Sequence, residues 1–472
     1  MELQLLNEVT EGHPVLMAVY YEDELDFMEK AKNLGFFEIS LPLSDQSVTS
    51  LKEQLEGKIA HNNELLTSLE DELRALASQT RQLELLSDQT ASEIELKKAV
   101  PAMTLDTVYI EGWVRHDRTQ RLKKAIEEVT DIYDLDIVDP TKEDIPPTCT
   151  VNNEFVTPFE TITDMFSKPS FSEVDPNPVM SVWYWILFGM MMGDAGYGLM
   201  MFILFYALIK IKKPQGGSRK LYLVFLYSSI TTAFWGIIFG SYFGVTWRPE
   251  WQPTWMFIEP LKEPMKLLIL SLIMGVGHIL SGLFLKIYAS IRSGNIWDAI
   301  FDQVSWVLVV VGLGLLFLPG IFSKVGMVMA ISGGLIVLFT GGRRKPSIFG
   351  KVTSGIVGLY AVTGYMSDVL SYSRIMALSL SSAVVAMVMN LLAGMIQGSV
   401  IGFIFSLFIY IIGHSFNLVM GLLSAYVHDG RLQYIEFFGK FYEGGGTPFK
   451  PLSVKLKYIN EINNDKIMKG DL

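Results

Sequence analysis

TSGIVGLYAVTGYMSDVLSYSRIMALSLSSAVVAMVMNLLAGMIQ, residues 353–397, is a run of about 45 mostly apolar residues without a proline. As one continuous helix it would be roughly 65 Å long, about twice the thickness of the hydrocarbon core of a bilayer. A membrane helix of that length has to be strongly tilted or bent. We therefore expect a membrane protein in which this segment forms a long, tilted helix.

A permanent positive charge, Arg374, lies near the middle of this run. An arginine at that depth costs from about 3 to more than 10 kcal/mol, depending on how the cost is measured. The cost is tolerated when the side chain faces water or the carboxylate of a partner. Arg374 lies more than 20 residues from either end of the run, so it cannot snorkel to an interface if the helix is continuous. We interpret Arg374 as a functional residue.

Composition divides the chain of 472 residues into two parts. Residues 1–178 are acidic and are the right size for one soluble domain, whereas residues 179–426 are a succession of apolar runs. The net charge of −11 comes largely from the front part, and no basic stripe indicates binding to nucleic acid. The single cysteine, Cys149, excludes an internal disulfide framework and a cysteine-based zinc site.

The front part predicts an α+β lobe on a coiled-coil stalk, spanning residues 1–138. Leucine and isoleucine recur with 3/4 spacing over residues 47–98, which is typical of a coiled-coil seam. No signal peptide begins the sequence, so we expect a cytoplasmic location. Asp117 is a plausible cap of one helix. The lobe is predicted to contain strands at 15–21, 36–41, 107–114 and 132–138, and helices at 22–34 and 117–130.

Residues 139–178 are rich in proline and lack a clear period, so we interpret them as a linker into the membrane. A membrane domain over residues 179–445 and a cytoplasmic tail over 446–472 follow. The membrane domain contains apolar runs at 179–209, 221–245, 265–287, 296–318, 326–339, 355–397 and 400–427.

Basic residues in the loops decide the orientation of these runs. They cluster in three loops, which we expect to be cytoplasmic: Lys210, Lys212, Lys213, Arg219 and Lys220; Lys286 and Arg292; and Arg343, Arg344 and Lys345. If residues 179–209 crossed once, the front lobe would lie outside. If they form a hairpin turning at residues 193–198, where glycines permit a sharp turn, there are about eight segments with both termini cytoplasmic. The hairpin fits the lack of a signal peptide better.

Two acids lie within or beside apolar runs. Asp194, in the glycine-rich GMMMGDAGYG, either lines an ion path or caps a helix, satisfied by neighbouring backbone amides; the glycines favour the structural interpretation. Asp368 lies six residues before Arg374. It either faces a cytoplasmic aqueous inlet or is an ordinary acid at a helix end.

Further polar residues lie in the membrane segments. Asn390 and Gln397, in the second half of the long run, are either inter-helix contacts or part of an ion path. His278 is an isolated histidine that fits a packed, hydrogen-bonded role as well as a proton relay. The last segment contains His414, Asn417, His428, Arg431 and Glu436. His428 and Arg431 are one helical turn apart, and Arg431 is a snorkelling residue by default unless it acts together with Arg374.

No phosphate-binding loop, dinucleotide-binding glycine pattern, zinc-protease motif or nucleophile elbow is present. We therefore expect a non-catalytic chain without a cofactor. A secondary cation transporter with broken helices around Asp194 and Asp368 is the alternative. That class often has two related halves, and residues 179–318 and 326–440 share no sequence echo. A membrane-anchored scaffold would not need Arg374.

Several motifs together resemble the membrane subunit of V-type and archaeal-type rotary ATPases, called subunit a or subunit I. They are FGMMMGDAGYG at 188–198, SDVLSYSRIMALSLS at 367–381, GHSFNLVMGLLSAYVHDGRLQYIEFFGKFYEGGGTPFKPL at 413–452, and PFE at 158–160 before SEVDPNP. The combination is highly specific and covers most of residues 158–452.

The resemblance implies that Arg374 is the essential arginine facing the ion-binding carboxylates of a rotating proteolipid ring, and that Arg431 is the second arginine. Helices at 355–397 and 400–440 would hug the ring, with two aqueous half-channels ending near Arg374 and conducting H⁺ or Na⁺. Implied partners are the ring, peripheral-stalk subunits of E/G type bound by the lobe, a central-stalk subunit of d/C type, and membrane lipid.

The resemblance also implies a multi-pass protein of a prokaryotic plasma membrane. Family members usually have a larger front domain with an opposing coiled-coil strand, so we expect that part of this domain is missing here. Ser381 and Ser382 stand where eukaryotic relatives have a histidine-containing ALSLAH pattern. A histidine-assisted channel is therefore not expected there.

Overall fold

The computed structural model describes residues 2–10, 13–19, 30, 33–34, 48–77, 79–98, 102–103, 107–141, 144–245, 258–316, 319–343, 347–451 and 457–458. The chain divides into two compact units, a front unit (Met1–Ala102 with Leu452–Leu472) and a membrane unit (Met103–Pro451).

The front unit contains an antiparallel hairpin and two helices. Strand β1 (Glu2–Thr10) pairs with β2 (His13–Val19), which confirms the expected strand over residues 15–19. The predicted helix at 22–34 lies mostly, and the strand at 36–41 entirely, outside the described residues. The residues predicted as a coiled-coil stalk form two helices, α2 (Val48–Ala77) and α3 (Thr80–Lys98).

Leucines of the predicted seam are largely exposed on α2 and α3, with Leu55 at 50% and Leu73 at 66%. An apolar seam on a helix is stabilised only when another helix covers it. Within the front unit, Asp88 of α3 accepts hydrogen bonds from the backbone amides of Lys457 and Tyr458, at 3.1 and 3.0 Å.

The first part of the membrane unit is only partly regular. Beyond β3 (Ala102–Met103), it contains β4 (Val108–Tyr109), the 3₁₀ turn η1 (His116–Arg118) and α4 (Thr119–Glu127). The strand predicted at 132–138 is absent, because no described segment pairs with it and a strand exists only through pairing. The predicted cap was also wrong, since the Asp117 carboxylate pairs with Arg115 at 2.7 Å.

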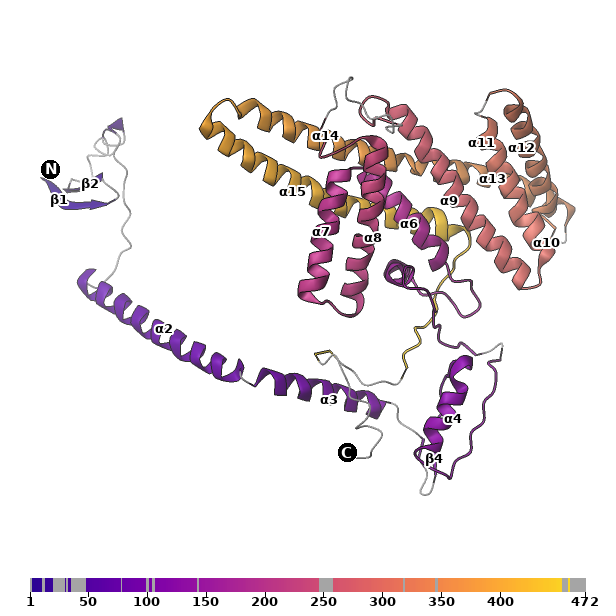
Figure 1. Cartoon of the computed structure of the whole chain (residues 1–472), viewed down its shortest axis with the longest axis horizontal. Coiled ribbons are helices and arrows are strands. Elements are labelled where there is room, and N and C mark those ends of the chain that lie inside the picture. Colours follow the sequence, from indigo (N-terminus) through magenta and orange to yellow (C-terminus); the bar gives the residue numbers. More distant parts are fainter. Residues whose placement is uncertain are drawn as a thin grey trace. The chain divides into compact units, whose positions relative to one another are not determined.

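The chain is a multi-pass membrane protein. Within the described residues, seven helices are long and apolar enough to cross a bilayer. The short α6 (Asn177–Met192) adds an eighth apolar helix, as expected, and Figure 1 shows how these helices are arranged in the membrane unit. The other helices are α7 (Ala195–Lys212), α8 (Gly216–Phe239), α9 (Pro264–Arg292), α10 (Ile296–Asp298) continuing through the π-helix η4 (Ala299–Val304) into α11 (Ser305–Leu316), α12 (Ile321–Thr340), α13 (Ile348–Ser371), α14 (Ser373–Ile396) and α15 (Val400–Arg431) with its extension η5 (Leu432–Phe437) and η6 (Phe438–Lys440).

Residues 179–209 are two helices joined by a turn at the predicted glycines and not a single helix, and both helices pack against α8. Helix α6 ends at Met192, and Gly193 adopts a left-handed conformation with φ of 47°. This conformation favours glycine because it lacks a Cβ atom. Asp194 then caps α7, with its side chain accepting a hydrogen bond from Tyr197 N.

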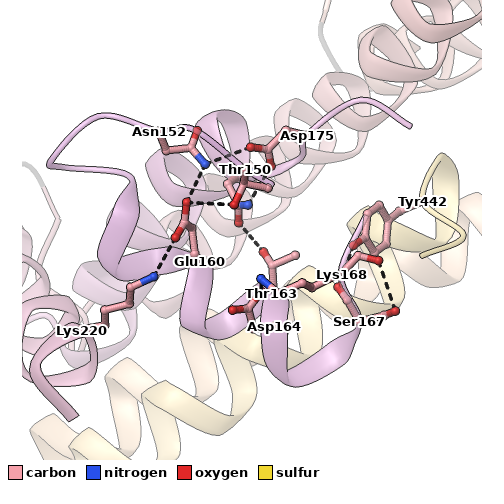
Figure 2. Close-up of polar contacts among 11 residues, drawn as sticks. Thr150, Asn152, Glu160, Thr163, Asp164, Ser167, Lys168, Asp175, Lys220 and Tyr442 are labelled. Atoms are coloured by element: carbon pink, nitrogen blue, oxygen red, sulfur yellow. Dashed lines mark hydrogen bonds and ion pairs between the residues drawn. The ribbon is translucent and has the colours of Figure 1, made fainter. Parts of the chain in front are cut away.

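The proline-rich segment does more than link, since its second half folds onto the helices. It contains η2 (Thr157–Phe159) and α5 (Glu160–Phe166), which contact α8 and α6. Figure 2 shows its polar contacts: Glu160, 7% exposed, pairs with Lys220 of α8 at 2.7 Å and accepts from Asn152 at 2.9 Å. The start of the predicted tail also contacts this segment, because Gly446 forms an antiparallel β-bridge with Lys168.

The long run at 353–397 is broken in the middle. A turn at Tyr372 separates α13 from α14, and Tyr372 itself keeps right-handed helical angles, with φ of −72° and ψ of −11°. Helix α13 packs against α12 and α9, whereas α14 packs against α15, α6 and α9. Both halves of the run therefore contact α9, while α12 packs against the first half and α15 and α6 pack against the second.

Candidate functional site

Arg374 lies in the first turn of α14, directly after the break at Tyr372. Its guanidinium Nη2 is 3.9 Å from Oε1 of Glu436, and the two side chains are 19% and 2% exposed. The buried Nη1 has no hydrogen-bond partner in the described part of the chain. Arg374 is thus a partly exposed cation that is held by one carboxylate and still has unused donors.

The opposing residues come from the end of α15. The helix continues as the π-helix η5, a form often found at functional sites. This geometry carries Glu436 toward the break. His428 and Arg431 lie close enough to Arg374 for their charges to interact, and Arg431 itself is exposed. The structure therefore brings together four residues predicted as site residues: Arg374, His428, Arg431 and Glu436.

Asp368 pairs with a different cation from the one that Glu436 contacts. Its carboxylate forms an ion pair with Lys440 of η6, whose ammonium lies 4.2 Å from the centre of the Tyr365 ring. Both Asp368 and Lys440 are partly buried. Asp368 is not an isolated helix-end acid, and it joins α13 to the end of the α15 extension.

A second polar cluster lies farther along the α14–α15 pair. His414 Nε2 is 3.0 Å from Asn390 Oδ1, and His414 Nδ1 is 2.6 Å from the hydroxyl of Tyr197. Asn417 donates to that hydroxyl and to the carbonyl of Ser382, both at 3.0 Å. Three predicted residues therefore form one network across α7, α14 and α15.

Three predicted residues lie outside both clusters. Asp194 is 3% exposed and accepts four hydrogen bonds, which confirms its interpretation as a helix cap. Gln397, at the end of the run, donates to the exposed hydroxyl of Tyr410. His278 is fully buried behind the break, with Nδ1 at 2.8 Å from the hydroxyl of Tyr372.

Sequence reasoning missed Tyr197, Tyr372, Asp429 and Gln433 as partners of the predicted residues. Tyrosine is common in membrane proteins, so the sequence did not mark Tyr372 or Tyr197. Only their contacts with His278 and His414, 94 and 217 positions away, identify them. Asp429 had a usable signal, since an acid in the last apolar segment is costly. Among the described residues, no group of three or more His, Cys, Asp or Glu side chains is arranged to hold a metal ion.

Comparison with known proteins identifies the family. The model of the V-type ATPase 116kDa subunit family matches residues 32–248 and 352–454, which include both arginines and Glu436. An A-type ATP synthase subunit I of Methanocaldococcus jannaschii is 32% identical over 453 residues, covering 84% of this chain and 64% of the relative.

Two further relatives have the same kind of name. An A-type ATP synthase subunit I of Pyrococcus horikoshii is 32% identical and covers 73% of this chain and 53% of its own length. A V-type ATP synthase subunit I of Chlamydia trachomatis serovar D is 24% identical, covering 88% and 72%. The chain spans 64% and 53% of the length of the two archaeal relatives. The match over most of this chain shows that it belongs to the V-type ATPase 116kDa subunit family.

Proposed function

We propose that this chain is the non-catalytic, ion-translocating stator subunit of a rotary ATPase or ATP synthase. The observation that carries the proposal is Arg374, a membrane arginine at a helix break that, among the described residues, pairs with one carboxylate, Glu436, at 3.9 Å. Its remaining donors suit the ion-binding carboxylate of a moving partner. The A-type and V-type subunit I names of the relatives support the same role.

The chemistry of arginine fits this task. Its guanidinium stays protonated under all physiological conditions, so it keeps an approaching carboxylate ionised and makes it release its bound cation. A fixed positive charge in a medium of low dielectric constant also opposes the direct passage of H⁺ or Na⁺. Transport then requires the partner carboxylate to move past Arg374, which couples rotation to ion flow.

The two polar clusters support two separate access paths to Arg374. We assign one path to the network of Asn390, His414 and Asn417, and the other to the side of His428, Arg431 and Asp368. Asn390 is 16 positions from Arg374, or about 24 Å along a helix. Water or ions reaching the two regions from opposite sides would not meet without the partner.

The partners and location follow from this role. The α13–α14 and α15 helices would contact a proteolipid ring, and the front unit would bind stalk subunits. The basic loops favour a cytoplasmic position for both termini in a prokaryotic plasma membrane.

The test is ATP-driven ion uptake by vesicles containing the assembled complex. Arg374→Gln is expected to abolish uptake while the ring still co-purifies. The control is Arg292→Gln, the same change at an exposed arginine at the end of α9, with uptake expected to stay within about twofold of wild type. Normal uptake with Arg374→Gln would refute the proposal.

A further inference from the structure

A line of four buried polar side chains lies behind Arg374. It runs from Tyr372 at the break, through His278 of α9, to Gln433 of η5 and Asp429 of α15. Each of the four side chains belongs to a residue with 0% exposure. No described lysine, arginine or histidine pairs with Asp429. Burying four polar groups, one of them a carboxyl without a cation, is costly and calls for an explanation.

Two of the three links in this line are direct contacts. The hydroxyl of Tyr372 is 2.8 Å from Nδ1 of His278. Gln433 Nε2 donates to Asp429 Oδ1 at 3.2 Å. The line is therefore fixed at both ends, with the break at one end and the α15 helix at the other.

The middle link joins two complementary atoms. His278 Nε2 and Gln433 Oε1 are both buried and have no hydrogen-bond partner within the described residues, although the two side chains are neighbours. If Tyr372 donates to Nδ1, the neutral imidazole carries its proton on Nε2, which is then a donor. An unpaired buried donor or acceptor costs about 1–3 kcal/mol. A small approach of the two atoms would satisfy both, so that every donor points from Tyr372 toward Asp429.

The surroundings restrict how the break can move. A Cβ on Gly275 would lie 2.4 Å from Tyr372 Cγ, so the Tyr372 ring is seated directly on the α9 backbone. The His278 ring stacks on Phe437 at 4.5 Å. The π-helix η5 also supplies Glu436, three residues after Gln433. The same turn of chain therefore contacts Arg374 directly and Tyr372 through His278.

We propose that Tyr372, His278, Gln433 and Asp429 are positioning residues for Arg374. The line ties the break to the end of α15 and thereby sets where the guanidinium points when a carboxylate passes. The proposal rests on the function proposed above. An apolar junction of the same volume would often be equally stable or more so, so stability alone does not account for this polar line.

The test uses the intact complex with Tyr372→Phe, Gln433→Leu and the double variant. Tyr288→Phe is the control, because it makes the same change at an exposed tyrosine on α9. Hydrogen–deuterium exchange of residues 369–376 reports on the break. We expect exchange to accelerate about tenfold in each single variant, equivalent to about 1.4 kcal/mol, and no further in the double variant. Unchanged exchange, or effects that multiply, would overturn the proposal.

The second measurement is the number of ions transported per ATP hydrolysed. Misplacement of Arg374 should lower this ratio severalfold in both single variants while the ring remains bound. A merely structural role would lower transport and hydrolysis in parallel, and that result would also overturn the proposal. If Arg374→Gln abolishes transport but Tyr372→Phe leaves the ratio unchanged, only the positioning role fails. If Arg374→Gln itself transports normally, the proposed function fails.

Discussion

Replacement of Asp194 distinguishes an ion-path carboxylate from a structural cap. Its Oδ1 accepts from the amides of Tyr197 and Phe243, both at 3.0 Å. Its Oδ2 accepts from the hydroxyl of Ser241 at 2.6 Å and from the amide of Gly244 at 3.3 Å. The carboxylate thus joins the start of α7 to the turn after α8. Each of its two oxygens accepts two hydrogen bonds from this chain.

The magnitude follows from these four bonds. A hydrogen bond to a charged group contributes about 1.5–3 kcal/mol, and bonds that share one carboxylate do not add fully. We expect Asp194→Ala to destabilise the membrane unit by about 3–5 kcal/mol. Asp194→Asn retains one acceptor oxygen and should cost about half as much. The matched control is Ser399→Ala, which removes an exposed cap with one bond from Gly402 N, for about 0.5–1 kcal/mol.

The assay is thermal unfolding of the purified complex, followed by ATP-driven uptake per assembled complex well below the transition. Asp194→Ala should lower the transition temperature by roughly 10 °C, with the uptake of the surviving complex within about twofold of wild type. A complex of normal stability that no longer transports ions would refute the structural role and make Asp194 part of the ion path.

Two further predictions concern the turn and the contact between α5 and α8. Gly193→Ala should destabilise the protein by more than about 1 kcal/mol, because φ is 47° and a Cβ would lie 2.9 Å from the Phe239 ring. The control is Gly216→Ala, where φ is 57° and a Cβ would meet nothing within 4 Å. In the same unfolding assay this control measures the cost of the backbone conformation alone. Lys220→Met should cost about 2–4 kcal/mol because it leaves the buried carboxylate of Glu160 without its cation. A double-mutant cycle with Glu160→Gln should give a coupling of about 1–2 kcal/mol, and a coupling near zero would contradict a stabilising ion pair.

Features that depend on local sequence were predictable. Hydropathy over successive windows is a local property, and it correctly gave the apolar helices and the hairpin turn at the glycines. Arg374 was also recognisable from sequence, because a charge in the middle of an apolar run is costly wherever the run packs. Strand predictions were weaker: the segment at 132–138 has β-forming residues but no described pairing partner, and pairing is not a local property.

The sequence alone was enough to establish that the chain spans a membrane and that Arg374 is a positive charge in the middle of an apolar run. Only the tertiary structure decided what each polar residue does. Glu436 reaches Arg374 at the end of α15, which continues through a π-helix. Asp194 caps α7 through Tyr197 N, and a turn almost 50 residues later supplies its other donors. Tyr372 at the break finds its buried partner, His278, on α9, roughly 100 residues away. Polar partners in a membrane are chosen by three-dimensional proximity, since each buried group must find a donor or acceptor, and no local pattern in the sequence records that choice.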